Sequence, residues 1–214
     1  MREKAEEILA WGMRERRKIE SEEQVLRWEN HSRGAAKVAE LVAEKAGMDA
    51  ELAYALGVLH VIGKYRGAGM EHAYAGYEKM MAEGMPEVAR VCVTHSFNPK
   101  SKLSVLELAG VEGEEAKFVR ELVEGTEYDD YDELIQLADF MSGMRGISTL
   151  ERRFCSVLLR HDLPDARKEL GVLYELKEKF DRMCGVNIYE LLRDEIIEAT
   201  FRGTPGEVKV KEVI

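Results

Sequence analysis

Five residues able to bind a metal ion interrupt stretches of sequence that should otherwise face the interior of a helical protein. They are His31, His60, His72, His95 and Asp139. A polar or charged side chain at a buried position costs several kcal/mol unless something compensates it. One buried histidine is usually satisfied by a carbonyl, and an isolated Asp139 could cap a turn or pair with Arg145. Five such residues in one chain predict a shared centre, and a metal ion is the simplest centre that would use them together.

Helical spacing puts these residues on inward faces. His31 extends an apolar series at i+4, i+7 and i+11, which consists of Ala35, Val38 and Val42. His60 lies within the segment 52–62, which is almost entirely apolar, and Asp139 shares a face with Ile135. An ionised carboxylate in such a place needs a cation.

The composition is typical of a helical protein. The 214 residues are 45% hydrophobic and 34% charged, and only four are proline. These values predict an all-α fold, and the helices placed below make it a bundle of about eight to ten helices. Without repeats or a credible linker, we expect one domain over residues 1–214, with a core at about 22–146 and a helical extension at 147–214.

The positions of apolar residues, glycines and prolines place the helices. Gly47 and Asp49 are expected to end one helix and cap the next. The segment 97–113 should be partly irregular, and residues 203–214 could form an edge strand or an extended arm. The expected helices cover 2–18, 22–46, 49–62, 71–83, 86–95, 114–124, 132–145, 148–160, 165–183 and 187–201.

Charge and cysteine content restrict the partners and the compartment. The net charge of −10 argues against a nucleic-acid binder, because a phosphate backbone requires a basic face. The cysteines, Cys92, Cys155 and Cys184, are odd in number and widely spaced, so we expect no disulfide framework and a reducing cytoplasm. No signal peptide is evident and no run of 18 apolar residues occurs, so no membrane span or membrane partner is expected.

The order of the short motifs resembles the HD-domain metal-dependent phosphohydrolases. His31 is followed by GVLHVIGK with His60, by His72, by THS with His95 and by LADFMSG with Asp139. The pieces WENHSRGAAKVAELVAEKAG, AYALGVLHVIGK and YDDYDELIQLAD also resemble a bacterial branch of that superfamily. The similarity runs from about Trp28 to about Gly146.

The resemblance implies an all-α bundle whose metal ligands project from different helices toward one pocket. In that family one histidine, a His-Asp pair and a late aspartate hold the first metal, which corresponds here to His31, His60, position 61 and Asp139. Members with a second metal add two histidines, which correspond to His72 and His95.

The sequence departs from the family at the defining pair, because residue 61 is Val61 and not aspartate. Two outcomes are open. His31, His60 and Asp139 alone form a two-histidine, one-carboxylate set that can still hold a divalent ion weakly. Alternatively, the pocket no longer binds metal tightly, and the protein is a poor catalyst or a binder.

The expected function is hydrolysis of a small phosphomonoester or nucleotide. One or two divalent ions would serve as cofactor, with Mn, Fe, Co, Ni, Zn and Mg all open. Besides their part in a second metal site, His72 and His95 are candidates for bonds to the phosphoryl oxygens. Lys64 and Arg145 are candidates for phosphate contact, and Arg33 is a weaker one. Oligomeric state does not follow from the sequence.

Two rival functions remain open. The first is a catalytically silent HD-domain protein that binds a phosphorylated small molecule in a regulatory role. The second is a helical interaction protein in which the histidines only pack.

Three further features are interpreted as structural. Asp129 or Asp130 is expected to cap the following helix in preference to lending a carboxylate to the metal. The literal pair His161-Asp162 lies in a polar turn and is interpreted as a solvated helix end. The run RERRK at 14–18 is interpreted as a solvated helix face.

Overall fold

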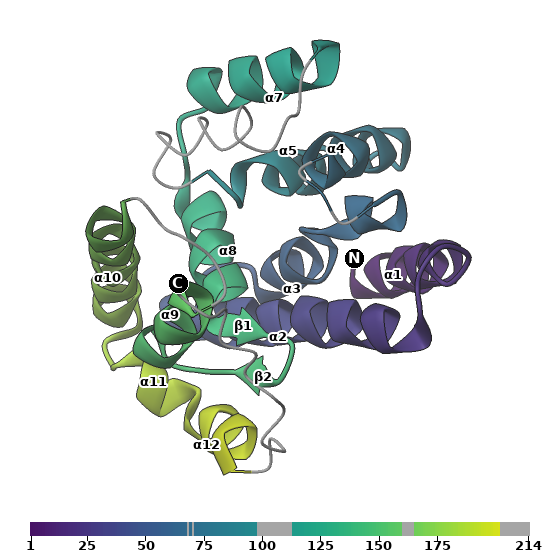
Figure 1. The fold of residues 1–214 in the computed structure, drawn as a ribbon. Coiled ribbons are helices and arrows are strands. Elements are labelled where there is room, and N and C mark those ends of the chain that lie inside the picture. The colour runs from purple at the N-terminus through teal and green to yellow at the C-terminus, as the bar shows by residue number, and fades with distance from the viewer. Residues whose placement is uncertain (68, 70, 98–112, 160–164, 202–214) are drawn as a thin grey trace, which may run out of the picture.

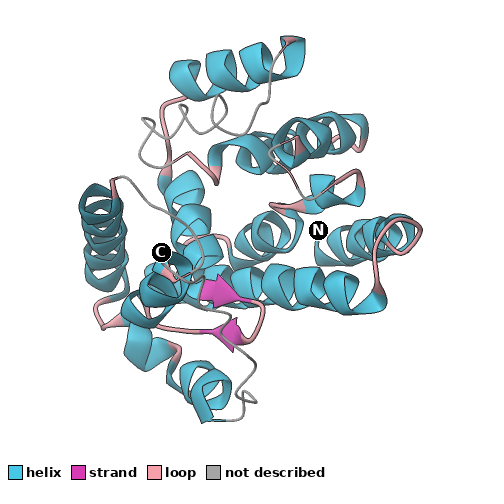
Figure 2. Cartoon of the chain, viewed as in Figure 1, coloured by secondary structure: helices cyan, strands magenta, loops and turns pink. Residues whose placement is uncertain are grey.

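The protein is almost wholly helical. The computed structural model describes residues 1–67, 69, 71–97, 113–159 and 165–201 (Figure 1). Within these residues it contains eleven α-helices, one short 3-10 helix and two very short strands (Figure 2). The elements are α1 (Arg2–Arg16), α2 (Glu22–Ala46), α3 (Ala50–Leu59), η1 (Ile62–Tyr65), α4 (His72–Ala82), α5 (Pro86–Thr94), α7 (Glu114–Gly125), α8 (Asp130–Met141), β1 (Ser142–Gly143), β2 (Gly146–Ile147), α9 (Leu150–Leu158), α10 (Ala166–Cys184), α11 (Ile188–Leu191) and α12 (Arg193–Phe201). The all-α prediction is confirmed.

Local signals define the ends of the central helices, and the sequence predicts those at Gly47 and Asp49. Ser21 and Gln24 form a reciprocal capping box at the start of α2. Gly47 ends α2 with a φ of 74°, a conformation that favours glycine. The Asp49 carboxylate accepts the backbone N–H groups of Glu51 and Leu52 and so caps α3.

The helix expected over 132–145 is wrong at its C-terminal end. Helix α8 stops at Met141, and β1 and β2 form a small antiparallel hairpin directly after it. Ser142 is already extended, and Gly146 has a φ of 107°, which helical backbone does not allow. The interpretation of 49–62 as one helix is also wrong, because α3 ends at Leu59 and η1 follows. The expected features at 98–112 and 203–214, and the pair His161-Asp162, lie outside the described residues.

Helix α2 packs against many of the other elements, including α3, α8, α10 and both strands (Figure 1). Helices α3 and α8 pack on it and on each other, and α10 packs on α2 and α8. Helix α1 contacts α3 and η1, while α4 and α5 lie side by side with α7 beyond them. A large core fills the space between these helices, and a second, smaller core lies beneath α7. As a result of these contacts, one common region of the bundle is surrounded by α2, α3, α4, α5 and α8.

Gly57 permits the closest approach between two helices of this region. A Cβ atom at Gly57 of α3 would lie 2.7 Å from Ala36 Cα and 2.9 Å from the Ala35 carbonyl oxygen of α2. Both contacts involve backbone, so a side chain could be accommodated only if the helices moved apart. The missing side chain therefore sets the distance between the helices that carry His31 and His60.

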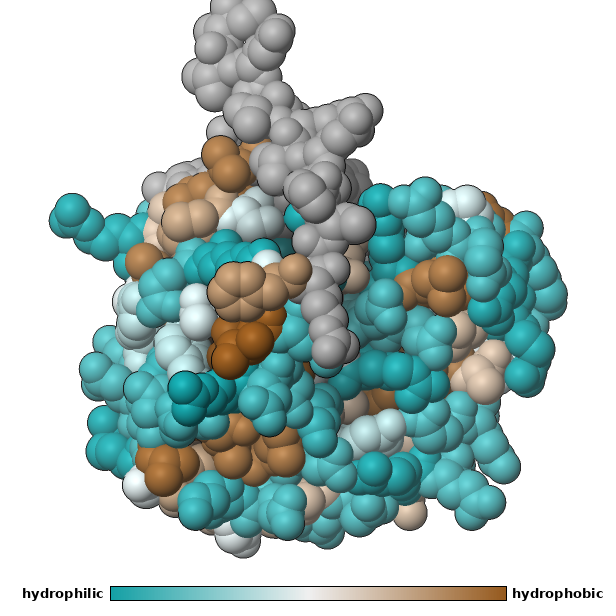
Figure 3. All heavy atoms as spheres, turned by 90° about the horizontal axis from the view of Figure 1, so that it is seen from below, coloured by the Kyte–Doolittle hydropathy of each residue, from teal (hydrophilic) through white to brown (hydrophobic). Residues whose placement is uncertain are grey.

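The face in Figure 3 is mainly hydrophilic, and its hydrophobic side chains form separate small patches. Among the described residues, no helix combines the length and the apolar character that crossing a membrane requires. All three cysteines are free thiols, as the sequence predicts; Cys92 and Cys184 are buried and Cys155 is exposed.

We predict that Gly57→Ala lowers the free energy of unfolding by about 1–3 kcal/mol, because the added methyl group overpacks the α2–α3 contact. Urea denaturation measures the change. Gly171→Ala is the matched control, since a Cβ there meets nothing within 4 Å and Gly171 lies inside α10. The control should gain up to about 1 kcal/mol from helix propensity. Equal effects of the two substitutions would contradict the close-approach argument.

Candidate metal centre

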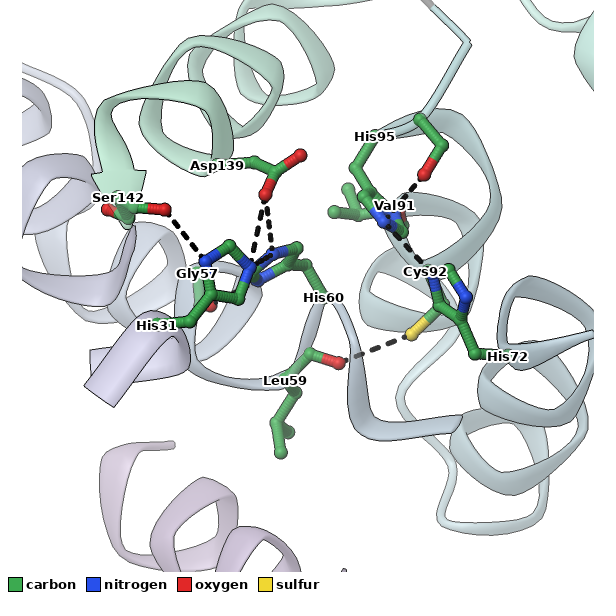
Figure 4. A network of polar contacts seen from close by, with 11 residues as sticks. His31, Gly57, Leu59, His60, His72, Val91, Cys92, His95, Asp139 and Ser142 are labelled. Carbon is green, nitrogen blue, oxygen red and sulfur yellow. Dashed lines mark hydrogen bonds and ion pairs between the residues drawn. The ribbon is translucent and has the colours of Figure 1, made fainter. Parts of the chain in front are cut away.

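Three side chains from three helices converge on one point. His31 projects from α2, His60 follows the last residue of α3, and Asp139 projects from α8 (Figure 4). The Nε2 atoms of the two histidines are 3.1 Å apart. Asp139 Oδ1 lies 3.1 Å from His31 Nε2 and 3.4 Å from His60 Nε2. All three potential ligand atoms lie within 4.8 Å of one another.

Backbone carbonyl groups orient the two imidazoles. His31 Nδ1 lies 2.8 Å from the Ser142 carbonyl oxygen, and His60 Nδ1 lies 2.7 Å from that of Gly57. Because a carbonyl oxygen can only accept, the hydrogen of each neutral ring is on Nδ1. Each Nε2 then presents a lone pair, which is the arrangement that metal-binding histidines show.

These three atoms fit a divalent cation. In the neutral form of both rings, two nitrogen lone pairs and a carboxylate oxygen face one another with no hydrogen between them, which is repulsive. Ligands at about 2.0–2.2 Å from one ion, at tetrahedral or octahedral angles, are about 2.9–3.5 Å apart. The observed separations of 3.1, 3.1 and 3.4 Å match this spacing. The arrangement is therefore suitable for binding one metal ion.

His72 and His95 form a second pair beside the first. Their Nε2 atoms are 3.4 Å apart, and their Nδ1 atoms lie 2.7 Å from the Gly69 oxygen and 3.0 Å from the Val91 oxygen. Ser96 Oγ lies 2.9 Å from His95 Nε2. The ring centroids of His60 and His95 are 5.0 Å apart, so the four imidazoles form a continuous row (Figure 4).

The centre opens into a pocket of about 430 Å³. Its wall contains His31, His72, His95 and Asp139, whereas His60 is fully buried behind them. The remaining lining residues are Arg16, Glu20, Gln24, Arg27, Trp28, Val61, Lys64, Ser96, Met144 and Arg153. A ligand in this pocket could therefore contact both the metal-binding side chains and several charged side chains.

A search with protein-family models matches the HD domain to residues 28–144, more than half of the chain. The chain belongs to the HD-domain family. HD domains typically bind divalent metals, and the family generally comprises metal-dependent hydrolases. Searches of curated proteins and of solved structures found no match.

Val61 directly follows His60 in the chain. Its side chain is 2% exposed and forms part of the pocket wall next to His60. An isopropyl group offers no ligand atom, so among the described residues the centre contains one carboxylate, that of Asp139.

Asp129 caps α8, as the sequence predicts, by accepting the backbone N–H groups of Tyr131 and Asp132. The Asp132 carboxylate is buried and accepts a hydrogen bond of 2.7 Å from Thr94 Oγ1. Both carboxylates thus make hydrogen bonds that hold α8 in place. Among the described residues, neither belongs to the group of side chains that could together hold a metal ion.

The basic residues that the sequence suggests for phosphate contact lie on two different pockets of this HD-domain protein. Lys64 lines the metal pocket, but Arg33 and Arg145 line a second pocket of about 460 Å³ between α2, the hairpin and α12. Arg33 is also ion-paired with Glu6 and Glu29. Arg145 is displaced because α8 ends at Met141 and the chain turns away.

Arg16 was missed as a pocket residue, and its interpretation as part of a solvated face is wrong. It is 6% exposed and lines the metal pocket. The available signal was helical spacing, since Arg16 continues the apolar series of Leu9 and Met13 at i+7 and i+3. Arg153 was also missed, and no comparable pattern in its helix points to the pocket.

Burial determines the protonation states at the centre. It lowers the pKa of His31 and lowers that of His95 still further, and it lowers the pKa of His72 to about 4. Burial alone would raise the pKa of Asp139, but the neighbouring His31 and His60 outweigh it and hold that pKa well below its usual value. At neutral pH these three imidazoles are therefore neutral and the carboxylate is ionised, which is the state that binds a cation.

We predict that the metal-free protein loses stability on acidification from pH 7.5 to 5.0. The folded state keeps His72 neutral down to a pKa of about 4, whereas an unfolded chain protonates it near 6.5. The unfolded state therefore binds more protons in this range, so its population rises as the pH falls. The contribution of His72 is about 2 kcal/mol at pH 5.0. Urea denaturation at both pH values should show a smaller loss for His72→Gln, and an equal loss would contradict the assignment.

Proposed function

We propose that this HD-domain protein is a metal-dependent phosphohydrolase that acts on a small phosphomonoester or a nucleotide, through a metal centre weakened by Val61. The observation that carries the proposal is the convergence of two imidazole lone pairs and an ionised carboxylate within 3.4 Å of one another, at the wall of a pocket. Side chains that only packed would each satisfy a separate neighbour, so the convergence argues against the interaction-protein alternative.

His31, His60 and Asp139 would hold the ion. When bound, a divalent ion lowers the pKa of a coordinated water and polarises a phosphoryl oxygen. His72 and His95 present Nε2 lone pairs at neutral pH, since their Nδ1 hydrogens face carbonyl oxygens. A lone pair cannot donate to a phosphoryl oxygen, so this pair favours a second metal over direct phosphate binding.

Lys64 is the residue best placed to bind the phosphate. Its ammonium group has no hydrogen-bond or ion-pair partner within the residues that the structure describes, although it lines the pocket. Burial lowers its pKa, and the nearby carboxylate of Asp139 opposes that shift. A phosphate dianion would provide the partner that the protein itself does not supply.

The donor set favours some metals over others. A centre of four imidazoles and one carboxylate suits Zn, Ni, Co or Fe better than Mg, which prefers oxygen ligands. Loss of the family carboxylate removes a negative charge from the site of a dication, so we expect weak binding.

The substitution Val61→Asp tests whether a missing carboxylate at position 61 weakens metal binding in this pocket. We predict that it raises the affinity for Zn or Mn by at least about tenfold, because even changes beside metal ligands alter affinity by 10–100-fold. Isothermal titration with chelator-treated protein measures the affinity. Val61→Asn is the control of equal shape without charge and should gain little. If the aspartate variant binds no more metal than the parent, the assigned centre is wrong.

Removal of a ligand should abolish metal binding. We predict that His31→Ala and Asp139→Ala each reduce the metal content of protein purified without chelator to background, as measured by elemental analysis. Asp130→Ala, which removes a carboxylate from the start of the same helix as Asp139, should retain the metal of the parent. Unchanged metal content in both ligand variants would support packing as the role of these residues.

Val61 also favours a second candidate, a catalytically silent protein that binds a phosphorylated small molecule in a regulatory role. A missing carboxylate impairs chemistry more than it impairs binding of an anion. Hydrolysis of a generic phosphomonoester with added Mn, Co or Ni supports the phosphohydrolase, whereas metal binding without turnover supports the silent binder.

A further inference from the structure

The hydroxyl group of Ser96 lies against the ring nitrogen of His95 that a metal ion would use. Ser96 Oγ is 2.9 Å from His95 Nε2, and His95 Nδ1 is 3.0 Å from the carbonyl oxygen of Val91. Because that carbonyl can only accept, the ring hydrogen is on Nδ1, and the Nε2 lone pair accepts the hydrogen of the Ser96 hydroxyl. An imidazole nitrogen has one lone pair, so His95 Nε2 can bind this hydrogen or a metal ion, but not both.

The spacing of His72 and His95 would otherwise suit an ion. Their Nε2 atoms are 3.4 Å apart. Two nitrogen ligands at about 2.0–2.1 Å from one tetrahedral ion have nearly this separation. His72 Nδ1 is 2.7 Å from the Gly69 carbonyl oxygen, so its Nε2 also presents a lone pair. A second ion that used both rings would therefore have to break the hydrogen bond between Ser96 and His95.

The chain next to Ser96 is anchored. Phe97, the following residue, is fully buried, and its N–H group donates to the Thr94 carbonyl oxygen at 3.2 Å. The carbonyl oxygen of Phe97 accepts the Tyr128 hydroxyl at 2.8 Å. The backbone at Ser96 is therefore not free to withdraw, and rotation of its side chain is the simplest way to release His95 Nε2.

The pair formed by the two later histidines has few other ligands with which to hold an ion. Within the described part of the chain, the one group of three or more potential ligands within reach of one another is His31, His60 and Asp139. Val61 offers no ligand atom that a second ion could share. An ion at the second pair would thus take two imidazoles from the described residues, so the loss of one hydrogen bond weighs heavily against its binding.

We propose that Ser96 limits the metal content of the centre. Its hydrogen bond to His95 opposes a second ion, so that the centre holds one ion, at His31, His60 and Asp139. This inference rests on the proposed function for the first ion. Ser96 acts through His95 and not on a substrate, so it is a positioning residue.

Titration of the full, chelator-treated chain with Zn²⁺ at pH 7.5, followed by calorimetry, tests the proposal. The parent should bind one ion, and any second ion should bind more weakly. Ser96→Ala should bind the second ion about fivefold more tightly than the parent, equivalent to about 1 kcal/mol, which is the net contribution of one hydrogen bond. The affinity for the first ion should be the same in both proteins. A general loss of structure would not strengthen one ion and spare the other.

Two variants serve as controls. Ser96→Thr keeps a hydroxyl group and should bind the second ion as the parent does. Ser32→Ala removes a fully buried hydroxyl next to His31 in the chain, and this hydroxyl has no hydrogen-bond partner among the residues that the structure describes. It should leave the affinity for the second ion unchanged. Thermal unfolding verifies that each variant is folded, and Ser96→Gly, which also lacks the hydroxyl, takes the place of Ser96→Ala if that variant does not fold.

A double variant locates the second ion. His72→Ala in the Ser96→Ala background should remove the second ion and keep the first. Persistence of the second ion in the double variant would overturn the proposal. Equal or weaker binding of the second ion by Ser96→Ala than by the parent, or an equal gain in Ser32→Ala or Ser96→Thr, would also overturn it.

The inference and the proposed function fail separately. One ion bound by the parent and also by Ser96→Ala, with no second ion in either, overturns the role of Ser96 and leaves the first site in place. No ion in the parent, with one ion in Ser96→Ala that His72→Ala removes, supports the role of Ser96 and overturns the proposed function. No ion in either protein overturns both.

Discussion

The structure depends on the close approach of two imidazole nitrogens and a carboxylate oxygen, which repel one another when both rings are neutral and carry their hydrogens on Nδ1. Lone pairs 3.1 to 3.4 Å apart repel each other in a buried site unless a cation is present. Carbonyl groups hold His31 and His60 from behind, so neither ring can turn away without losing a hydrogen bond. The protein thus maintains an unfavourable arrangement whose natural compensation is a metal ion.

Much of the surrounding fold serves this arrangement. Gly57 provides the close contact between α2 and α3, and its own carbonyl accepts the hydrogen of His60. Ser142 ends α8 in an extended conformation, and its carbonyl orients His31. Stability and site geometry are therefore coupled, because the residues that allow the helices to pack also position the ligands.

Val61 affects both the affinity of the candidate site for a metal ion and the stability of the surrounding core. A buried valine next to His60 is compatible with the apolar core, whereas an aspartate there would require a cation to be tolerated. With valine at this position the folded state needs no cation to offset a buried charge there, and Asp139 is the carboxylate of the candidate metal site among the described residues.

The sequence by itself determined the helical class, the helix end at Gly47, the capping residue Asp49 and the inward position of the metal-binding candidates. These features are local, because periodicity and capping act within one or two turns of helix. It also predicted which five residues would share a region, but their roles as ligands stay predictions. Helical spacing in α1 already carried a signal for an inward Arg16, but only the tertiary structure showed that Arg145 lies on a different pocket and that α8 ends at Met141. Each of these depends on contacts between segments distant in the chain, and such contacts are decided by packing, which no local pattern encodes.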